Sequence, residues 1–231
     1  MITCLETGFF KDMDYKRITI IAGHYGSGKT NLAVNIAYDL KNKYENVVLA
    51  DADIVNPYFR SKDSEAELSA AGIRLISSKY AGSNVDIPAM PQEFYSITDD
   101  RSIHAVMDIG GDDRGAYALG RFSEMIVNEN DYDMLAVINM YRPLTRDVDS
   151  TIEILREIEN AAHISFTGIV NNSNLAEETQ INDILASQKY AEQISLAMNI
   201  PIKMTGVKYD LYEALKGSLP GLFPMRLQQK I

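Results

Sequence analysis

The chain has 231 residues, 46% of them hydrophobic and 23% charged, which are ordinary values for a globular protein with a sizeable core. Its formal net charge of -10 provides no basic surface for binding nucleic acid or an anionic membrane. The single cysteine, Cys4, excludes a disulfide framework and a Cys-x-x-Cys site within one chain, and His24, His104 and His163 show no metal-ligand spacing.

The beginning of the chain is unlike a targeting segment. The first fifteen residues contain acidic side chains and only brief apolar pairs, which is not the pattern of a signal peptide. No apolar run approaches the roughly 20 residues of a membrane span. We therefore expect a cytoplasmic protein with no membrane partner, in which residues 1–16 form an N-terminal extension and residues 17–231 form a single domain.

A glycine-rich stretch at residues 23–30 is the strongest motif. It follows a short β-branched segment at residues 17–22 and fits the phosphate-binding pattern G-x-x-x-x-G-K-[ST]. After it, Leu32, Ile36 and Leu40 recur at four-residue spacing, which is typical of one face of a helix. Strand, glycine loop and helix are the arrangement that this motif, the P-loop, requires.

The residue types of the P-loop suit polyphosphate. Several backbone N–H groups must converge on the phosphate oxygens, and glycines let the main chain come close enough. The helix N-terminus adds a partial positive charge. We expect Lys29 to reach the β- and γ-phosphates and the Thr30 hydroxyl to bind Mg²⁺. The residues that this motif assigns to the nucleotide are Gly23, His24, Tyr25, Gly26, Ser27, Gly28, Lys29, Thr30 and Asn31.

Downstream of the P-loop, apolar runs alternate with helical patterns. This alternation predicts an α/β fold with three layers and a mostly parallel, doubly wound sheet. Thr145 is the expected N-cap of one helix. Residues 78–102, rich in loop signals, are either a substrate or partner surface or a plain connection. The candidate strands are residues 47–50, 73–76, 105–107, 134–138, 166–170 and 202–204.

Two candidate strands end in carboxylates. One leads into Asp51 and Asp53, and another leads into Asp108 followed by Gly110 and Gly111. In an open α/β sheet, ligands bind at the carboxyl ends of the strands, so these carboxylates are expected to face the phosphate site. The segment around Asp108 has the form of a Walker B motif, in which the acid holds the metal and a glycine N–H approaches the γ-phosphate.

Together these motifs resemble the deviant-Walker-A ATPases, the MinD/ParA group of P-loop NTPases related to dethiobiotin synthetase and the nitrogenase iron protein. The resemblance covers roughly residues 17–225 and also includes Pro57 after the Asp51-x-Asp53 segment. Within it, Ile169-Val170-Asn171 resembles a strand that ends in an adenine-contacting Asn, and residues 204–210 resemble the following loop that covers the base.

The resemblance implies roles for individual residues. Asp53 would orient or activate the attacking water, and Lys29 and Asp108 would complete the catalytic set. Gly111 would approach the γ-phosphate. The expected Mg²⁺ ligands are Thr30, Asp51 and Asp108, and the residues expected around the adenine are Asn171, Val207, Lys208 and Tyr209.

One position departs from the family pattern. The signature lysine, which reaches the nucleotide of a second subunit in the family, is replaced here by His24. This leaves open whether ATP drives formation of a homodimer. His24 is either a weaker cation at that position or a loop residue that packs beside Tyr25.

The base and the purpose of the nucleotide follow from weaker signals. ATP is expected rather than GTP, because the stretch at residues 171–174 lacks the acid with which related folds read guanine. We expect a slow ATPase that acts as a nucleotide-gated switch for a protein partner. The alternatives are an ATP-dependent phosphotransferase or ligase resembling dethiobiotin synthetase, and a metallocentre-maturation ATPase, which the missing cysteine pair disfavours.

Overall fold

The computed structural model describes residues 13–52, 65–77, 92–111 and 113–227. These form an eight-stranded sheet in which every neighbouring pair of strands is parallel, in the order β3-β2-β4-β1-β5-β6-β7-β8. The strands are β1 (Ile18–Ala22), β2 (Val47–Ala52), β3 (Arg74–Ser77), β4 (His104–Ile109), β5 (Tyr132–Ile138), β6 (Gly168–Asn171), β7 (Ile202–Lys208) and β8 (Leu222–Met225).

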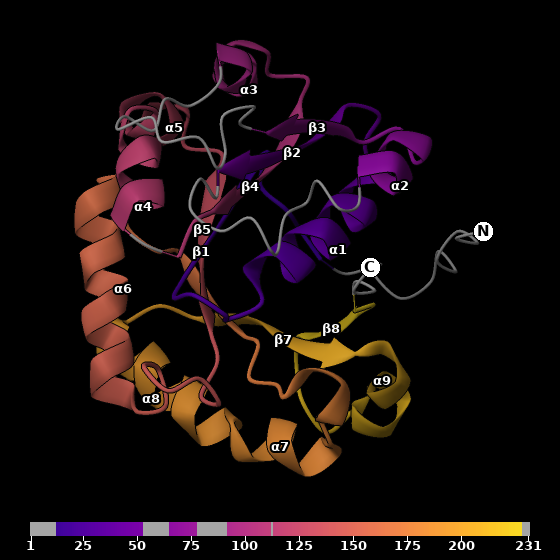
Figure 1. Cartoon of the computed structure of the whole chain (residues 1–231), viewed down its shortest axis with the longest axis vertical. Coiled ribbons are helices and arrows are strands. Elements are labelled where there is room, and N and C mark those ends of the chain that lie inside the picture. The colour runs from indigo at the N-terminus through magenta and orange to yellow at the C-terminus, as the bar shows by residue number, and fades with distance from the viewer. Residues whose placement is uncertain (1–12, 53–64, 78–91, 112, 228–231) are drawn as a thin grey trace.

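Helices cover both faces of the sheet, as Figure 1 shows, and this confirms the predicted three-layer α/β fold. On one face lie α1 and α2, and on the other lie α4, α5, α6 and α8. The helices are α1 (Lys29–Lys41), α2 (Glu65–Ala70), α3 (Tyr95–Asp99), α4 (Asp113–Gly120), α5 (Ser123–Glu129), α6 (Val148–Ala162), α7 (Ile181–Ala186), α8 (Gln188–Met198) and α9 (Tyr209–Leu215).

The two faces have separate apolar cores because successive side chains of a strand point to opposite faces. In β1, Ile18 and Ile20 pack under α4, α6 and α8, whereas Ile21 packs against Leu32 and Ile36 of α1. The strands β1, β2, β4, β5 and β6 are buried almost throughout, which explains their nearly continuous apolar sequences.

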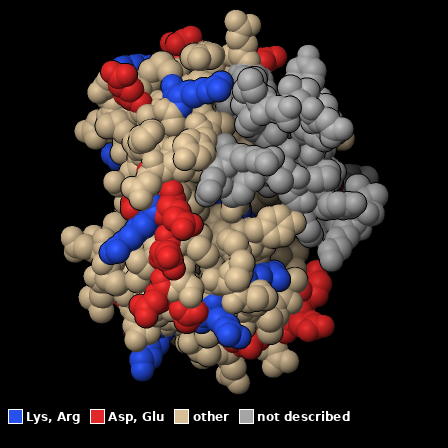
Figure 2. All heavy atoms as spheres, turned by 60° about the vertical axis from the view of Figure 1, so that its left-hand side comes forward, with Lys and Arg blue, Asp and Glu red and all other residues tan. Residues whose placement is uncertain are grey.

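The strand order reverses at β1, which lies between β4 and β5. Ligands of open α/β sheets bind outside the carboxyl ends of the strands at such a reversal. The P-loop directly follows β1, so the fold places it at the expected ligand position. On the face turned forward in Figure 2, acidic and basic side chains lie next to one another rather than in one basic surface.

Two expectations from the sequence need correction, and one strand has no counterpart among them. The N-cap of α6 is Asp147, whose carboxylate accepts a 2.9 Å hydrogen bond from the Ser150 N–H, whereas the buried Thr145 hydroxyl donates to the Asn139 carbonyl. Residues 204–210 are not a loop, because β7 extends to Lys208 and α9 begins at the next residue. The strand β8 was not predicted.

The region at residues 78–102 is only partly described. Residues 78–91 lie outside the described residues, but a 3₁₀ turn, η2 (Gln92–Phe94), leads into α3. Phe94 and Ile97 are each 1% exposed and belong to the core, so this part of the segment has a structural role. Among the residues that the structure describes, no helix has both the length and the apolar character required to cross a bilayer.

Candidate functional site

The P-loop is shaped by glycines at two close backbone approaches. Gly23 has a φ of 152°, and a Cβ there would lie 2.3 Å from the Val137 carbonyl oxygen of β5. Gly28 has a φ of 88° and forms the N-cap of α1, with the Asn172 side-chain amide 2.4 Å from the position of a Cβ. Only glycine fits both places without displacing a neighbour. Gly26, with a φ of 76°, lies between them in the same loop.

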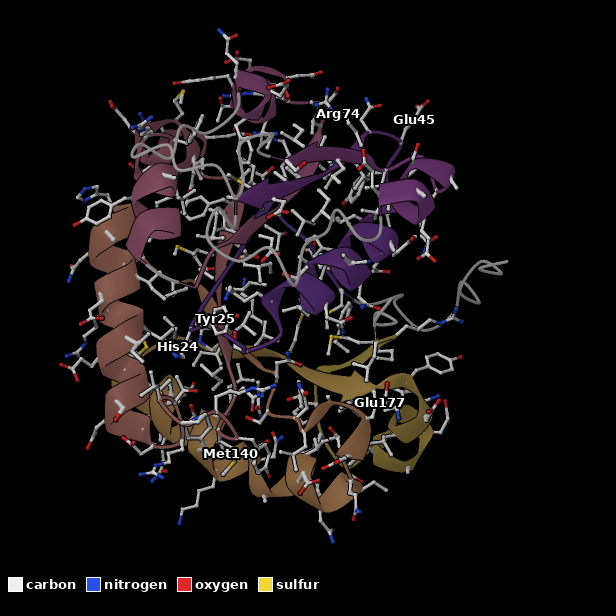
Figure 3. All side chains as sticks on the ribbon, in the orientation of Figure 1. His24, Tyr25, Glu45, Arg74, Met140 and Glu177 are labelled. Carbon is white, nitrogen blue, oxygen red and sulfur yellow. The ribbon has the colours of Figure 1, made fainter. Side chains whose placement is uncertain are left out.

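Donors of the P-loop converge on one acceptor, the His24 carbonyl oxygen. The Lys29 ammonium lies 3.2 Å from this oxygen and the Ser27 N–H donates to it at 3.3 Å. Lys29 is only 6% exposed, so its charge is held inside the loop. The shared target is a carbonyl oxygen of the loop itself, and a side-chain cation and a backbone N–H are the types of donor that bind a phosphate oxygen. Figure 3 shows His24 and Tyr25 side by side in this loop.

A second cluster lies beside the first residues of α1. The Thr30 hydroxyl donates a 2.6 Å hydrogen bond to the Asp108 carboxylate at the end of β4. Asp51 and Asp108 occupy paired positions of the neighbouring strands β2 and β4 and are 4% and 1% exposed. Two adjacent buried carboxylates and a hydroxyl are hard oxygen donors, which suit Mg²⁺. The residues present therefore fit the metal that the motif implies.

Gly111 closes the site from the side of β4. A Cβ at Gly111 would lie 2.7 Å from the Tyr25 nitrogen and 3.0 Å from the Lys29 ammonium. The segment after β4 thus touches the P-loop main chain, and a side chain at this position would displace it. The approach of Gly111 to the γ-phosphate stays a prediction. Asp53 and Pro57 lie outside the described residues.

Two residues that the sequence analysis did not select hold the P-loop from outside. Asn172, in the segment after β6, donates a 2.7 Å hydrogen bond to the Ser27 carbonyl. Arg142, in the segment after β5, donates through Nε at 2.7 Å to the Gly26 carbonyl. Asn172 directly follows the predicted Asn171, but no signal in the sequence separates the two amides, and nothing in the sequence near Arg142 indicated its position.

The residues predicted around the base lie in different environments. Asn171 is 1% exposed, and its side chain donates to the Ser187 hydroxyl at 2.9 Å and accepts from the Ser173 N–H at 3.3 Å. Its own hydrogen bonds do not favour contact with adenine, which stays a prediction. The Val207 side chain is 1% exposed and packs in a small apolar cluster under α7 and α9. Asn31 lies in the first turn of α1.

Lys208 and Tyr209 lie at the junction of β7 and α9 beside charged neighbours. The Lys208 ammonium is 2.8 Å from the Glu177 carboxylate, which raises the pKa of Lys208, and Tyr209 lies under the Arg226 guanidinium at 5.6 Å from the ring centre. Glu177 belongs to the segment after β6, so this ion pair joins the ends of β6 and β7. These contacts place both predicted residues at the carboxyl edge of the sheet, where ligands of this fold bind.

His24 is half-buried, and its burial together with the nearby Lys29 charge lowers its pKa below the ordinary value. The neutral imidazole is therefore the stable form at neutral pH in this structure. Position 24 does not supply the permanent charge of the signature lysine. Its role toward a second subunit stays a prediction.

Comparison with known proteins agrees with this geometry. A family model described as the CobQ/CobB/MinD/ParA nucleotide binding domain (CbiA) matches residues 18–203. No curated protein sequence matches. Similar solved structures include FtsY from Mycoplasma mycoides, with 20% identity and a TM-score of 0.53 over 86% of this chain and 62% of that one.

Two further structures have the same fold. Chloroplast FtsY from Physcomitrella patens has 16% identity and a TM-score of 0.55 over 84% of this chain and 59% of that one. The signal recognition particle receptor FtsY from Elizabethkingia anophelis in complex with GDP has 15% identity and a TM-score of 0.52 over 84% and 58%. The matched region thus spans less than two thirds of these longer proteins, and the likeness concerns the fold alone. With the family model matching most of the chain and the P-loop, Thr30 and Asp108 arranged as described, the protein belongs to the CobQ/CobB/MinD/ParA nucleotide-binding domain family.

Proposed function

We propose that this protein binds ATP with Mg²⁺, hydrolyses it slowly, and uses the two nucleotide states as a switch for a protein partner. The observation that supports this most is the convergence of the Lys29 ammonium and the Ser27 N–H on one point inside the P-loop, next to the Thr30–Asp108 hydrogen bond. A triphosphate offers oxygens to the first set of donors, and its metal ion suits the second.

Each group has a separate task in this proposal. Lys29 and the loop N–H groups bind and orient the β- and γ-phosphates. Thr30, Asp51 and Asp108 would hold Mg²⁺, which stabilises negative charge on the phosphates when it is bound. Asp53 accepts a proton from the attacking water or orients it. The protein thus contributes mainly positioning and charge stabilisation, as is usual in phosphoryl transfer.

We propose ATP rather than GTP as the preferred nucleotide. The segment after β6 has Asn174 where guanine-reading relatives have an acid, and its side-chain amide already donates to the Asn172 carbonyl at 2.7 Å. An amide presents both a donor and an acceptor, whereas guanine recognition needs an acceptor pair. Because the GDP complex concerns a similar fold at 15% identity, it carries no argument about the base in this chain.

Slow hydrolysis by the isolated chain is part of the switch proposal. An arginine finger or equivalent contributes a factor of roughly 10³–10⁵ to turnover, and a partner is the natural source of such a group. Loops that follow the γ-phosphate then present different surfaces in the ATP and ADP states. We propose a protein partner rather than nucleic acid, because the net charge is -10.

Titration calorimetry with Mg-ATP tests the proposal. Lys29→Ala is expected to weaken binding at least about tenfold, because charged hydrogen bonds are worth about 1.5–3 kcal/mol. Lys189→Ala, which removes an exposed lysine from α8, is the matched control and should bind like the wild type. Unchanged affinity of Lys29→Ala would contradict the assignment of the site. Equal displacement of labelled ATP by GTP would contradict the assignment of the base. Rapid turnover without any partner would contradict the switch.

A further inference from the structure

Arg142 contacts the outer side of the P-loop, and the role that this contact suggests rests on the proposed nucleotide binding. Arg142 Nε donates to the Gly26 carbonyl at 2.7 Å, so this carbonyl points out of the loop. In a planar trans peptide, the N–H of the next residue points the opposite way. That N–H belongs to Ser27, and it donates to the same His24 oxygen that the Lys29 ammonium contacts. Arg142 therefore holds one end of a peptide whose other end donates to the His24 oxygen, beside the Lys29 ammonium.

Arg142 is carried on a rigid support. Asn139 is fully buried, and its side-chain oxygen accepts from the Tyr141 N–H at 3.0 Å while its amide donates to the Asn174 carbonyl at 3.2 Å. The Thr145 hydroxyl donates to the Asn139 carbonyl at 2.8 Å. Residues 139–145 are thus fixed at both ends and joined to the segment after β6. A guanidinium on such a support has a defined position, which a long surface side chain usually lacks.

Folding does not require the contact between Arg142 and the P-loop. Gly26 is exposed, so its carbonyl can bond to water when the guanidinium is absent. What water cannot provide is a fixed direction and a permanent positive charge. The neighbouring His24 does not supply this charge, because burial and Lys29 lower its pKa. Removing Arg142 is therefore expected to affect the nucleotide more than the fold.

We propose that Arg142 is a positioning residue of the nucleotide site, which orients the Gly26–Ser27 peptide toward the phosphates and adds a permanent charge beside the P-loop. It acts through the loop from outside, on the Gly26 carbonyl, and is not an arginine finger. One of its five N–H donors is used for this bond, and the planar guanidinium carries a positive charge.

The experiment compares Arg142→Gln and Arg142→Lys with the control Arg146→Gln. Arg146 is an exposed arginine of the same connection, so its variant removes an equal charge four residues away. Binding of Mg-ATP and Mg-ADP is measured by calorimetry, and the unfolding temperature is measured without nucleotide. Arg142→Gln should weaken ATP binding about tenfold, which corresponds to about 1.4 kcal/mol, and ADP binding less. Its unfolding temperature should stay within about 2 °C of the wild type, as for most surface substitutions.

Arg142→Lys should restore most of the ATP affinity, because an ammonium can donate to a carbonyl and keeps the charge. Arg146→Gln should bind both nucleotides like the wild type. Equal affinity of Arg142→Gln and the wild type would overturn the inference while leaving the nucleotide site intact. A large fall in the unfolding temperature of Arg142→Gln, without recovery in Arg142→Lys, would also overturn it, since the residue would then be structural. If the wild type bound no nucleotide, the proposed function would fail and the inference with it.

Discussion

Asn172→Asp exchanges the amide NH₂ group, with its two N–H donors, for an oxygen at almost constant volume. In the wild type the Asn172 amide donates at 2.7 Å to the Ser27 carbonyl, and the side chain is 1% exposed. Its own oxygen is buried without a hydrogen-bond partner among the described residues. After the exchange, a carboxylate oxygen faces the Ser27 carbonyl oxygen at the same distance, so an attraction becomes a repulsion in a buried place.

The expected cost follows from this geometry. The lost hydrogen bond contributes about 0.5–1.5 kcal/mol, and a buried carbonyl left without a donor costs about 1–3 kcal/mol more. The free energy of unfolding should therefore fall by about 2–4 kcal/mol at neutral pH, which lowers the unfolding temperature by about 5–15 °C for a chain of this size. ATP binding should weaken as well, because the Ser27 carbonyl belongs to the P-loop.

The pH dependence gives a second measurement. Burial raises the folded-state pKa of the introduced carboxyl above its unfolded value of about 3.9. The folded state then binds the extra proton, so the loss of stability is full above the folded-state pKa and diminishes as the pH falls through it. The protonated carboxyl can donate to Ser27. Denaturant unfolding across this range tests the sign.

The control for this experiment is Asn182→Asp, the same exchange at an exposed position of α7. Its stability should stay within about 0.5 kcal/mol of the wild type at every pH. If Asn172→Asp behaved like this control, the hydrogen bond between Asn172 and the P-loop would not exist in solution, and the argument for an outer support of the loop would fail.

Three further changes test the site from other directions. Gly111→Ala places a Cβ 2.7 Å from the Tyr25 nitrogen, which should cost about 1–3 kcal/mol of ATP-binding free energy. Calorimetry should then show roughly 5–150-fold weaker ATP binding, and unaltered affinity would contradict the close approach. In the free protein, burial and Lys29 lower the pKa of His24, and bound polyphosphate should raise it. ATP binding should therefore take up a proton. The ATP affinity should fall as the pH rises from the pKa of His24 in the free protein to its pKa in the ATP complex. Calorimetry in buffers of different ionisation heat measures this uptake, and its persistence in His24→Gln would exclude His24 as its source. Asp53→Asn should retain ATP binding and lose most hydrolysis in a phosphate-release assay; unchanged turnover would remove Asp53 from the mechanism.

Local patterns were sufficient for the strands and the P-loop. The runs that became β1 to β7 were visible in the sequence as short apolar segments, and those of the inner strands are the most continuous because strands covered on both faces need apolar side chains throughout. The P-loop was visible because its glycines and Lys29 act within one short segment. The strand β8 was not predicted because it contains Pro224. A proline is accepted on the unpaired side of an edge strand such as β8 but not in a central strand.

Two neighbouring residues at the end of β6 have different partners that the local sequence does not predict. Asn171 and Asn172 are identical in type, yet the first is bonded to Ser187 and the second to the P-loop. Which amide faces the P-loop depends on how β6 is placed beside β5 and on the backbone direction after the strand. A sequence pattern fixes neither.

The sequence by itself determined the fold class, the phosphate-binding loop and the position of Asp51 and of Asp108, each at the end of an apolar run, because each of these features depends on residues close together in the chain. The pairing of the two carboxylates across β2 and β4 depends on the tertiary structure. Only the tertiary structure decided what holds that loop from outside. Arg142 and Gly26 are 116 positions apart, and Asn172 and Ser27 are 145 apart. Contacts over such separations exist because the sheet places β5 beside β1 and β6 beside β5. Alternation of strands and helices along a chain does not specify the order in which the strands pair.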